Sequence, residues 1–264
     1  MCREFPEKDS INDGAVALLR GGPVPRSRVV RGFTLVELLV VVSIIALLIS
    51  ILLPSLRKAR EQARCVVCMS NLHQVSSSLT TYTLENRDYL PAAACPSADS
   101  PEEDYWLCVL QQYARQPLVA RCPKDQTGKP FLNWANPPQD RATWQDYRWS
   151  SYAINFSLVP TPQNPHDYNR MGTIRRANSV IYLAEVRCGA GYDSADHIHS
   201  DLWEGDEDPK KEVAWDRHRN CSNYLFVDSH VEPLHWKATW EFPSKNLWWP
   251  SHAPGWPPIE EPPP

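Results

Sequence analysis

Hydrophobic residues are concentrated in one uninterrupted run near the start of the chain. From Phe33 to Leu53 the sequence reads FTLVELLVVVSIIALLISILL, and Glu37 is the only charged residue in it. About 21 apolar residues are enough to cross roughly 30 Å of hydrocarbon as a helix. A cleavable secretory signal normally has a shorter apolar region that ends at a small-residue site, whereas this run leads into Pro54 and basic residues. We therefore predict a membrane-spanning helix over residues 33–53.

Beyond the run, the apolar positions become periodic. They recur at three- and four-residue steps among charged and polar residues, at Leu52, Leu56, Ala59, Ala63, Val66, Val67, Leu72, Val75, Leu79 and Tyr82. This spacing predicts an amphipathic continuation of the helix over residues 54–87. One helix over residues 33–86 would be roughly 80 Å long, and we expect Pro54 to kink it near the membrane surface.

After Pro91 the helical periodicity is lost, and short runs are broken by Pro, Gly and Asn. Strand-like segments at residues 179–186 and 224–227 predict a small antiparallel sheet. The predicted fold class is α+β, a long helix packed on a small antiparallel sheet, with the head over residues 88–240. Residues 241–264 read as an extended Pro/Trp-rich tail. Its tryptophans could dock a partner or pack back on the head: Trp248, Trp249 and Trp256.

Charge and cysteine content narrow the functional class. The 264 residues carry a formal net charge of −4, so an overall basic surface for nucleic acid is absent. Basic residues flank the apolar run on both sides, so charge does not orient the helix. Seven of the eight cysteines lie after the run, scattered rather than grouped as close pairs. We therefore expect disulfides, and a head outside the cytoplasm.

The start of the apolar run resembles a known processing signal. A basic leader ends at Arg31-Gly32, and Phe33-Thr-Leu-Val-Glu37 opens the hydrophobic helix. This junction resembles the type IV prepilin and type II secretion pseudopilin signature. The resemblance implies that a prepilin peptidase cuts after Gly32, removes residues 1–32 as a leader and methylates the amine of Phe33. It also implies other pseudopilin subunits and an inner-membrane assembly platform as partners.

Glu37 has a physical role consistent with this resemblance. A carboxylate deep in the bilayer costs about 2.5–3.5 kcal/mol on insertion scales, and it usually persists only with a partner. The resemblance implies that Glu37 of one subunit faces the Phe33 amine of a neighbour during assembly, through a helix that Pro54 shapes. The alternative is a glutamate close enough to the helix end to reach the headgroups.

Two further segments resemble pseudopilin-like families. Residues 59–91 resemble an Arg-x-x-x-Cys-x-x-Asn-Leu-x-Gln stretch followed by Tyr and Leu-Pro, which implies a disulfide between Cys68 and Cys122. His218 and Asp228 are separated by nine residues and resemble the H-x9-DG element, with Ser229 in place of Gly. We expect a two-residue hairpin turn at positions 228–229, between a strand over residues 223–227 and one starting at position 230.

Metal-binding residues are the remaining candidates for chemistry. His218, Asp228 and His230 could be metal ligands, although such residues more often satisfy local hydrogen bonds. An acidic and His-rich loop could hold Ca²⁺ or Zn²⁺, but a solvated charged loop is favoured because its spacing does not match an EF-hand. Its residues are Asp193, Asp196, His197, His199, Asp201, Glu204, Asp206, Glu207 and Asp208. No cofactor is assigned.

Three functions follow from these patterns. The first is a structural, non-enzymatic subunit of a type II secretion or type IV pilus-like fibre, anchored once in the bacterial inner membrane with its head outside the cytoplasm. The alternative is a membrane-anchored extracytoplasmic module that binds carbohydrate or protein, with tryptophans as stacking platforms. A metal-dependent hydrolase rests only on the acidic loop, because no nucleophile motif or phosphate loop is recognised.

Overall fold

The computed structural model describes residues 33–91, 105–134, 136, 138–159, 169–189, 197–241 and 244–250. Residues 1–32, which include Gly32 at the predicted cleavage site, lie outside the described residues. So do Asp193, Asp196 and Trp256. The chain divides between Ser50 and Ile51 into two compact units, and each is described by itself.

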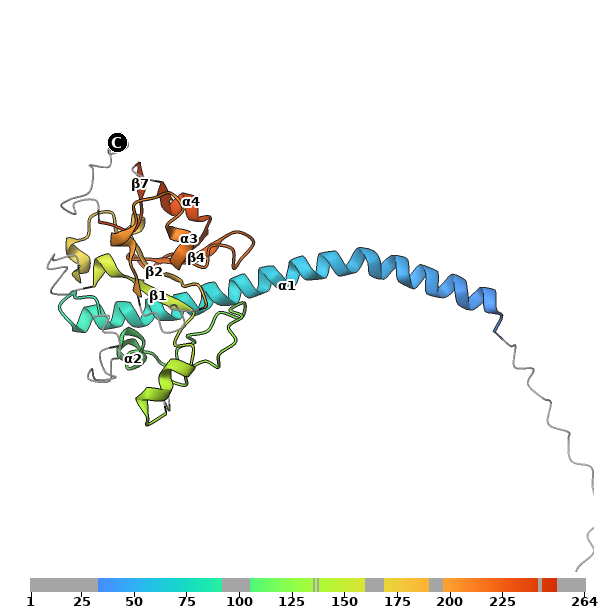
Figure 1. Cartoon of the computed structure of the whole chain (residues 1–264), viewed down its shortest axis with the longest axis horizontal. Helices are drawn as coiled ribbons and strands as arrows, with labels where there is room; N and C mark the ends of the chain where they lie inside the picture. Colours follow the sequence, from blue (N-terminus) through green and yellow to red (C-terminus); the bar gives the residue numbers. More distant parts are fainter. Residues whose placement is uncertain are drawn as a thin grey trace, which may run out of the picture. The chain divides into compact units, whose positions relative to one another are not determined.

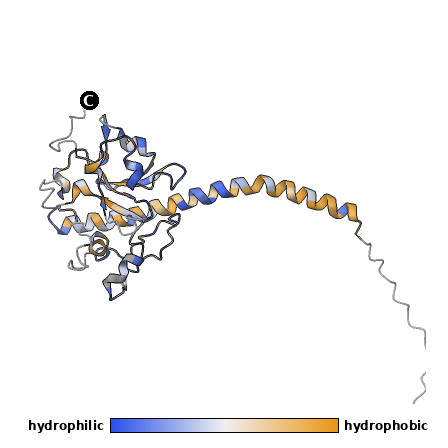
Figure 2. Ribbon diagram, in the orientation of Figure 1, coloured by the Kyte–Doolittle hydropathy of each residue, from blue (hydrophilic) through white to orange (hydrophobic). Residues whose placement is uncertain are grey.

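Helix α1 (Leu35–Glu85) contains 51 residues and continues through Pro54. Its first part is the apolar run (Figure 2). Among the described residues it is the one helix long and apolar enough to cross a membrane. The predicted spanning helix and its continuation therefore form one uninterrupted helix.

The second part of α1 packs on the head, but only the later part of the predicted apolar stripe is buried. Leu72, Val75 and Leu79 are buried as expected, whereas Leu56 and Val67 are exposed. The buried face begins at Cys68 and includes polar side chains, namely Asn71, Ser76, Ser78 and Thr83. Because small polar residues share the buried stripe, a search for apolar side chains alone placed the packing face too early in the helix.

A five-stranded sheet forms the centre of the head, in the order β3-β1-β2-β4-β5. Its strands are β1 (Tyr152–Asn155), β2 (Ile181–Glu185), β3 (His197–Ile198), β4 (Ser222–Phe226) and β5 (Val231–Leu234). The pairs β1–β2, β2–β4 and β4–β5 are antiparallel, and only β3 pairs in parallel, with β1. The predicted α+β fold with a small sheet is confirmed, and the sheet is mostly rather than wholly antiparallel.

Strands β1, β2 and β4 are buried on both faces because their side chains alternate between two cores. Tyr152 and Ile154 join the core that contains the buried face of α1, which runs along β1 and β2 (Figure 1). Ala153 and Phe226 join a second core rich in tryptophan. Short helices precede or connect the strands: α2 (Trp106–Gln111), α3 (Pro209–Glu212), α4 (Trp236–Thr239) and 3-10 turns at Arg141–Asp146, Phe156–Leu158, Met171–Thr173, Ala177–Ser179 and Ser200–Leu202.

The hairpin predicted around Asp228 is present between β4 and β5, but its turn is longer than two residues. Phe226 N–H donates to His230 O (3.0 Å), and Ser229 N–H donates to Phe226 O (3.0 Å). Three residues therefore form the loop, the arrangement that places one residue in the left-handed region after a type I turn. That residue is Ser229, with φ of 80°, where the family element has Gly.

The start of the predicted tail folds onto the head instead of extending from it. Strands β6 (Trp240–Glu241) and β7 (Lys245–Asn246) pair as an antiparallel hairpin. Trp248 is fully buried in the tryptophan-rich core. Ile181 N–H also donates to Leu247 O (2.7 Å), which ties the segment to β2. Burial of a large aromatic side chain favours this packing over exposure.

Candidate functional site

The N-terminus of α1 is closed by a reciprocal pair of polar side chains. Thr34 donates to Glu37 Oε2 from both its backbone N–H (2.9 Å) and its hydroxyl (2.7 Å). The Glu37 N–H in turn donates to Thr34 Oγ1 (3.3 Å). This is a capping box, which satisfies backbone donors that a helix end leaves unpaired. The Thr-x-x-Glu spacing signals it in the sequence, and our sequence analysis did not use that signal.

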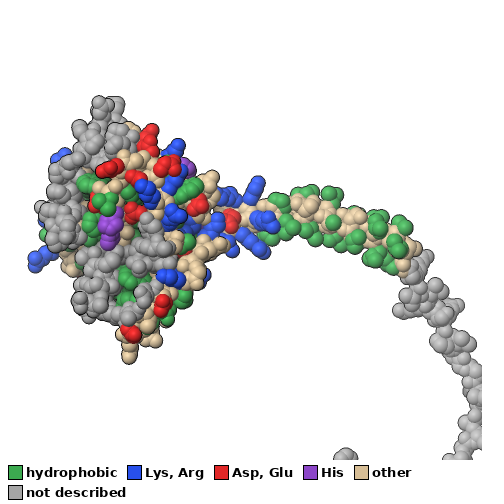
Figure 3. All heavy atoms as spheres, viewed as in Figure 1, with side chains coloured by type: hydrophobic (Ala, Val, Ile, Leu, Met, Phe, Trp, Pro, Cys, Tyr) green, Lys and Arg blue, Asp and Glu red, His purple; other side chains and the backbone are tan. Residues whose placement is uncertain are grey.

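The apolar run of α1 presents a continuous hydrophobic surface. From Leu35 to Leu53 its large side chains are between 45% and 78% exposed in the isolated chain. Figure 3 shows these side chains covering the first part of the helix. A contiguous apolar surface of this size is not stable in water and indicates a membrane or protein-binding role. The run therefore has the length and surface of a membrane anchor.

A group of basic side chains follows the apolar run on α1, where Figure 3 shows Lys and Arg together. Its members are Arg57, Lys58, Arg60 and Arg64. Glu61 lies among them and pairs with Arg64 (3.5 Å) and with Lys124 of the head. The hydrogen bond from Lys124 lowers the pKa of Glu61. The change from apolar to basic marks where the membrane-compatible part of α1 ends.

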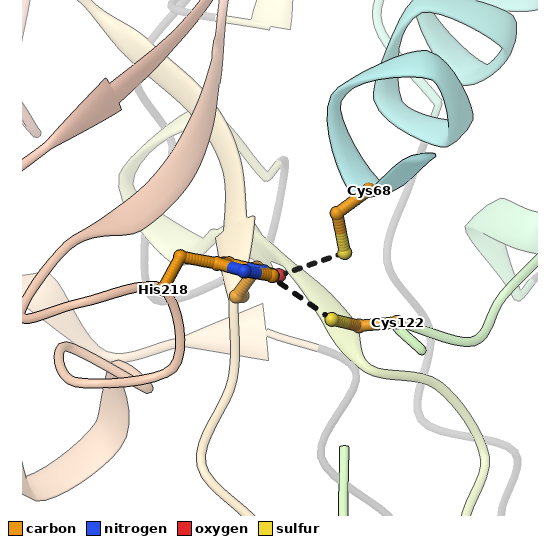
Figure 4. Close-up of side chains that lie close together, drawn as sticks. Cys68, Cys122 and His218 are labelled. Carbon is orange, nitrogen blue, oxygen red and sulfur yellow. Dashed lines mark hydrogen bonds and ion pairs between the residues drawn. The ribbon is translucent and has the colours of Figure 1, made fainter. Parts of the chain in front are cut away.

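A second candidate site lies inside the head, where four side chains of metal-binding type converge. Cys68, Cys122, Glu185 and His218 are all buried, and their ligand atoms lie within 4.8 Å of one another. Figure 4 shows the side chains of Cys68, Cys122 and His218 pointing toward a common point. Four separate segments supply them: α1, the loop before β1, the end of β2 and the turn before β4.

Direct contacts link the four groups in a chain. Cys68 Sγ donates to Glu185 Oε1 (3.0 Å), and His218 Nε2 lies 3.0 Å from the same oxygen. His218 Nε2 also lies 3.4 Å from Cys122 Sγ. One carboxylate oxygen and one ring nitrogen thus connect both sulfurs.

Backbone N–H groups and side-chain hydroxyls around the cluster hold these four side chains in place. The other carboxylate oxygen, Glu185 Oε2, accepts hydrogen bonds from Asn223 N–H (2.8 Å) and from the Ser222 hydroxyl (3.3 Å). The Lys124 N–H donates to Cys122 Sγ (3.4 Å), and the Tyr152 hydroxyl lies 3.1 Å from Cys68 Sγ. Glu185 Oε1 is therefore the carboxylate oxygen presented to the two sulfurs and the imidazole.

Burial and mutual contact shift the pKa values within this cluster. Burial raises the pKa of Glu185, but the hydrogen bond with His218 and the charge of Arg217 outweigh it and lower the pKa to about 2. Burial lowers the pKa of His218, but its contacts with Cys122 and Glu185 raise it to about 9. The hydrogen bond between the thiols lowers the pKa of Cys122 to about 7 and raises that of Cys68. Negative charge is thus favoured on Glu185 and Cys122.

The structure brings together some of the predicted site residues and separates others. Cys68 and Cys122 come together as predicted, but both are free thiols in the structure. His218 lies beside them, whereas Asp228 and His230 contact each other (2.5 Å) on the hairpin turn. The three residues therefore do not form one close group among the described residues, and Asp228 and His230 make the kind of local hydrogen bond that the sequence analysis favoured. Sequence reasoning missed Glu185, although an acid at the end of the apolar strand IYLAE is a recognisable signal.

The acidic and His-rich loop is occupied by local interactions in its described part. Asp208 Oδ2 accepts the N–H groups of Glu204 and Gly205 (2.8 Å each), and Glu207 pairs with Lys210 (2.5 Å). His197 and His199 contact each other through their Nε2 atoms (2.9 Å). Among the described residues, one group of three or more side chains of metal-binding type lies close together, the buried Cys/Glu/His cluster. No residue of this loop belongs to that cluster.

The tryptophans do not form an exposed stacking platform in the described part of the chain. Seven of them are buried: Trp106, Trp144, Trp149, Trp203, Trp236, Trp240 and Trp248. Trp134 stacks on Tyr105 at 4.5 Å between ring centroids. These rings pack the head, so no observation favours the carbohydrate-binding alternative.

Comparison with known proteins identifies the start of α1. The model of the prokaryotic N-terminal methylation motif matches residues 27–53, which include the predicted cleavage site and the whole apolar run. The chain is 39% identical over 59 residues to the type IV wide pilus major component PilA4 of Thermus thermophilus, covering 22% of this chain and 45% of that protein.

Type II secretion system core protein G from two bacteria is also similar to the chain. The Escherichia coli protein is 28% identical over 102 residues, 39% of this chain and 70% of the relative. The Pectobacterium carotovorum protein is 30% identical over 107 residues, 38% of this chain and 64% of the relative. The chain thus spans less than half of the pilus component and about two thirds of the secretion proteins. No solved structure matches it at a significant level.

Proposed function

We propose that this prepilin-like chain is a structural subunit of a type II secretion pseudopilus or a type IV pilus-like fibre. The observation that carries the proposal is the methylation motif over residues 27–53, which contains the exposed apolar run 33–53 with Glu37 as its one charge. Its relatives are named as components of a pilus and of a secretion system. The proposed role is assembly rather than catalysis.

In this proposal a prepilin peptidase cuts between Gly32 and Phe33 and methylates the new amine. The mature chain is then held once in the bacterial inner membrane by residues 33–53, with the head outside the cytoplasm. Other pilin-like subunits contact it through the apolar run, and an inner-membrane platform drives assembly. The exposed surface of the run supports this, because the same side chains can face lipid before assembly and other helices afterwards.

Mass spectrometry of the mature amino terminus tests the proposal. The chain is expressed in bacteria with and without a prepilin peptidase, purified from membranes and digested. We expect a peptide that begins at N-methylated Phe33 when the peptidase is present, and an intact residue 1–32 segment when it is absent. A chain that keeps residues 1–32 in the presence of the peptidase, or loses them equally without it, would contradict the proposal.

A further inference from the structure

The buried cluster of Cys68, Cys122, Glu185 and His218 has no part in the proposed assembly through α1. Placing four ionisable side chains together inside a protein is unfavourable unless they satisfy one another or share a ligand. Their donor atoms come from segments far apart in the sequence, and all converge within 4.8 Å. The arrangement therefore needs an explanation other than local packing.

We propose that these four residues bind a single Zn²⁺ ion through Cys68 Sγ, Cys122 Sγ, Glu185 Oε1 and His218 Nε2. Two thiolates, an imidazole and a carboxylate are all ligand types that Zn²⁺ takes, usually four at a time. Bonds of about 2.0–2.3 Å in a tetrahedron give ligand-to-ligand distances of about 3.3–3.8 Å. The contacts of 3.0 Å and 3.4 Å and the 4.8 Å limit bracket these distances, so small side-chain movements suffice.

The outer contacts prepare each donor for this role. Asn223 and Ser222 hold Glu185 Oε2, which leaves Oε1 for the ion. The Lys124 N–H donates to Cys122 Sγ, a bond that stabilises a thiolate. His218 Nδ1 is buried and has no hydrogen-bond partner among the described residues, and it would carry the proton when Nε2 binds the metal.

The charge of the occupied site is balanced by buried arginines. Two thiolates and one carboxylate carry three negative charges, so Zn²⁺ leaves a net charge of −1. Arg217 is buried beside the cluster and interacts with Glu185, Cys122 and Cys68. Asp125 contacts both Arg217 (3.4 Å) and Arg148 (3.0 Å). The two arginines together therefore balance Asp125 and the remaining negative charge of the site. A metal ion in this cavity leaves no uncompensated charge.

All four ligands are protein side chains and all are buried, which is the pattern of a structural zinc site with no open position for substrate. Such an ion would join α1 to the end of β2 and to the segments before β1 and β4. The zinc site would give His218 the role of a ligand at the entry to β4. The nine residues between His218 and Asp228 form the turn into β4, β4 itself and the start of the hairpin turn. The site does not rest on the proposed fibre function.

The test is metal analysis of the full chain purified in detergent without chelators. We expect one Zn²⁺ per chain and, after replacement with Co²⁺, a thiolate-to-cobalt charge-transfer band. The variants Cys68→Ser, Cys122→Ser and His218→Gln should each lose the stoichiometric ion and the band. The matched control is Cys65→Ser, which removes another thiol one turn earlier on α1 and should keep both.

Peptide mapping without reduction tests the alternative that Cys68 and Cys122 form a disulfide. A linked peptide joining Cys68 to Cys122 in the isolated protein would overturn the proposal, because a disulfide consumes both thiolates. Wild-type protein without stoichiometric metal, whose reduced form also takes up no Co²⁺, would overturn it too. Since wild type alone decides these outcomes, variants that fail to fold do not obscure the result. Processing at Phe33 is measured on the same samples, so the two proposals fail separately.

Discussion

Glu37 has two possible polar partners, Thr34 within its own chain and, in the proposed fibre, the amine of Phe33 on a neighbouring subunit. The capping box occupies Oε2. A carboxylate has two oxygens and can accept several hydrogen bonds, so the cap and an intersubunit ion pair are compatible. The sequence identified this residue from its isolation in an apolar run, whereas the cap depends on a spacing that was overlooked.

Substitution at these two positions separates the roles. We expect Glu37→Ala to be cleaved and inserted in the membrane but to lose assembly, because it removes the proposed partner of the neighbouring amine. Thr34→Ala removes the cap, at a cost of about 0.5–2 kcal/mol, but keeps the acid and should still assemble. Recovery of sheared or cross-linked oligomers measures the difference. Equal assembly of wild type and Glu37→Ala would contradict the expected role.

The buried cluster shows why a site of this kind escapes sequence reasoning. Cys68, Cys122, Glu185 and His218 have no short spacing between them, so no local motif joins them. The pairing of Cys68 with Cys122 came from family resemblance, and the structure brings them together as thiols. Their convergence depends on the order of the strands and on where α1 crosses the sheet, which only the folded chain reveals.

At the scale of elements, the extent of α1 was predicted well, whereas its packing face was predicted only in the later part of the helix. Its length follows from the long apolar run, from the amphipathic spacing that continues it, and from the absence of glycine within it. Its packing face does not, because Asn71 and Ser76 are buried with Leu72 while larger apolar residues stay exposed. Asn71 donates to Arg121 O (3.1 Å) and Ser76 to Ser229 O (3.2 Å), so hydrogen bonds compensate their burial.

This orientation predicts effects of very different size for two aliphatic residues of α1. Leu72 is fully buried against the sheet, and Leu72→Ala should lower the free energy of unfolding by about 2–5 kcal/mol. Val67 is 47% exposed, and Val67→Ala should change it by no more than about 0.5 kcal/mol. Urea unfolding of the full chain in detergent, followed by tryptophan fluorescence, measures both. Similar losses in the two variants would mean that the helix packs through another face.

At the scale of the whole molecule, the second core gives the end of the described chain a structural role. The sequence left open whether the tail tryptophans dock a partner or pack back, and for Trp248 the structure favours packing. Its ring lies 5.0 Å from that of Trp203 and 6.0 Å from that of Tyr224. Composition alone could not decide this, because tryptophan is suited both to buried cores and to interfaces.

The contribution of Trp248 to the stability of the second core can be measured. Trp248 O accepts from Asn155 Nδ2 (2.5 Å), and its indole N–H donates to Thr239 Oγ1 (3.3 Å), so the residue connects β1 to α4. Trp248→Ala should therefore cost about 3–5 kcal/mol, as expected for loss of a buried indole ring. Leu202→Ala is the control, because Leu202 is 69% exposed and its loss should cost no more than about 0.5 kcal/mol. Denaturant unfolding compares the two variants; if Trp248→Ala unfolds at the wild-type midpoint, the segment does not close the core, and its tryptophans regain the role of a docking strip.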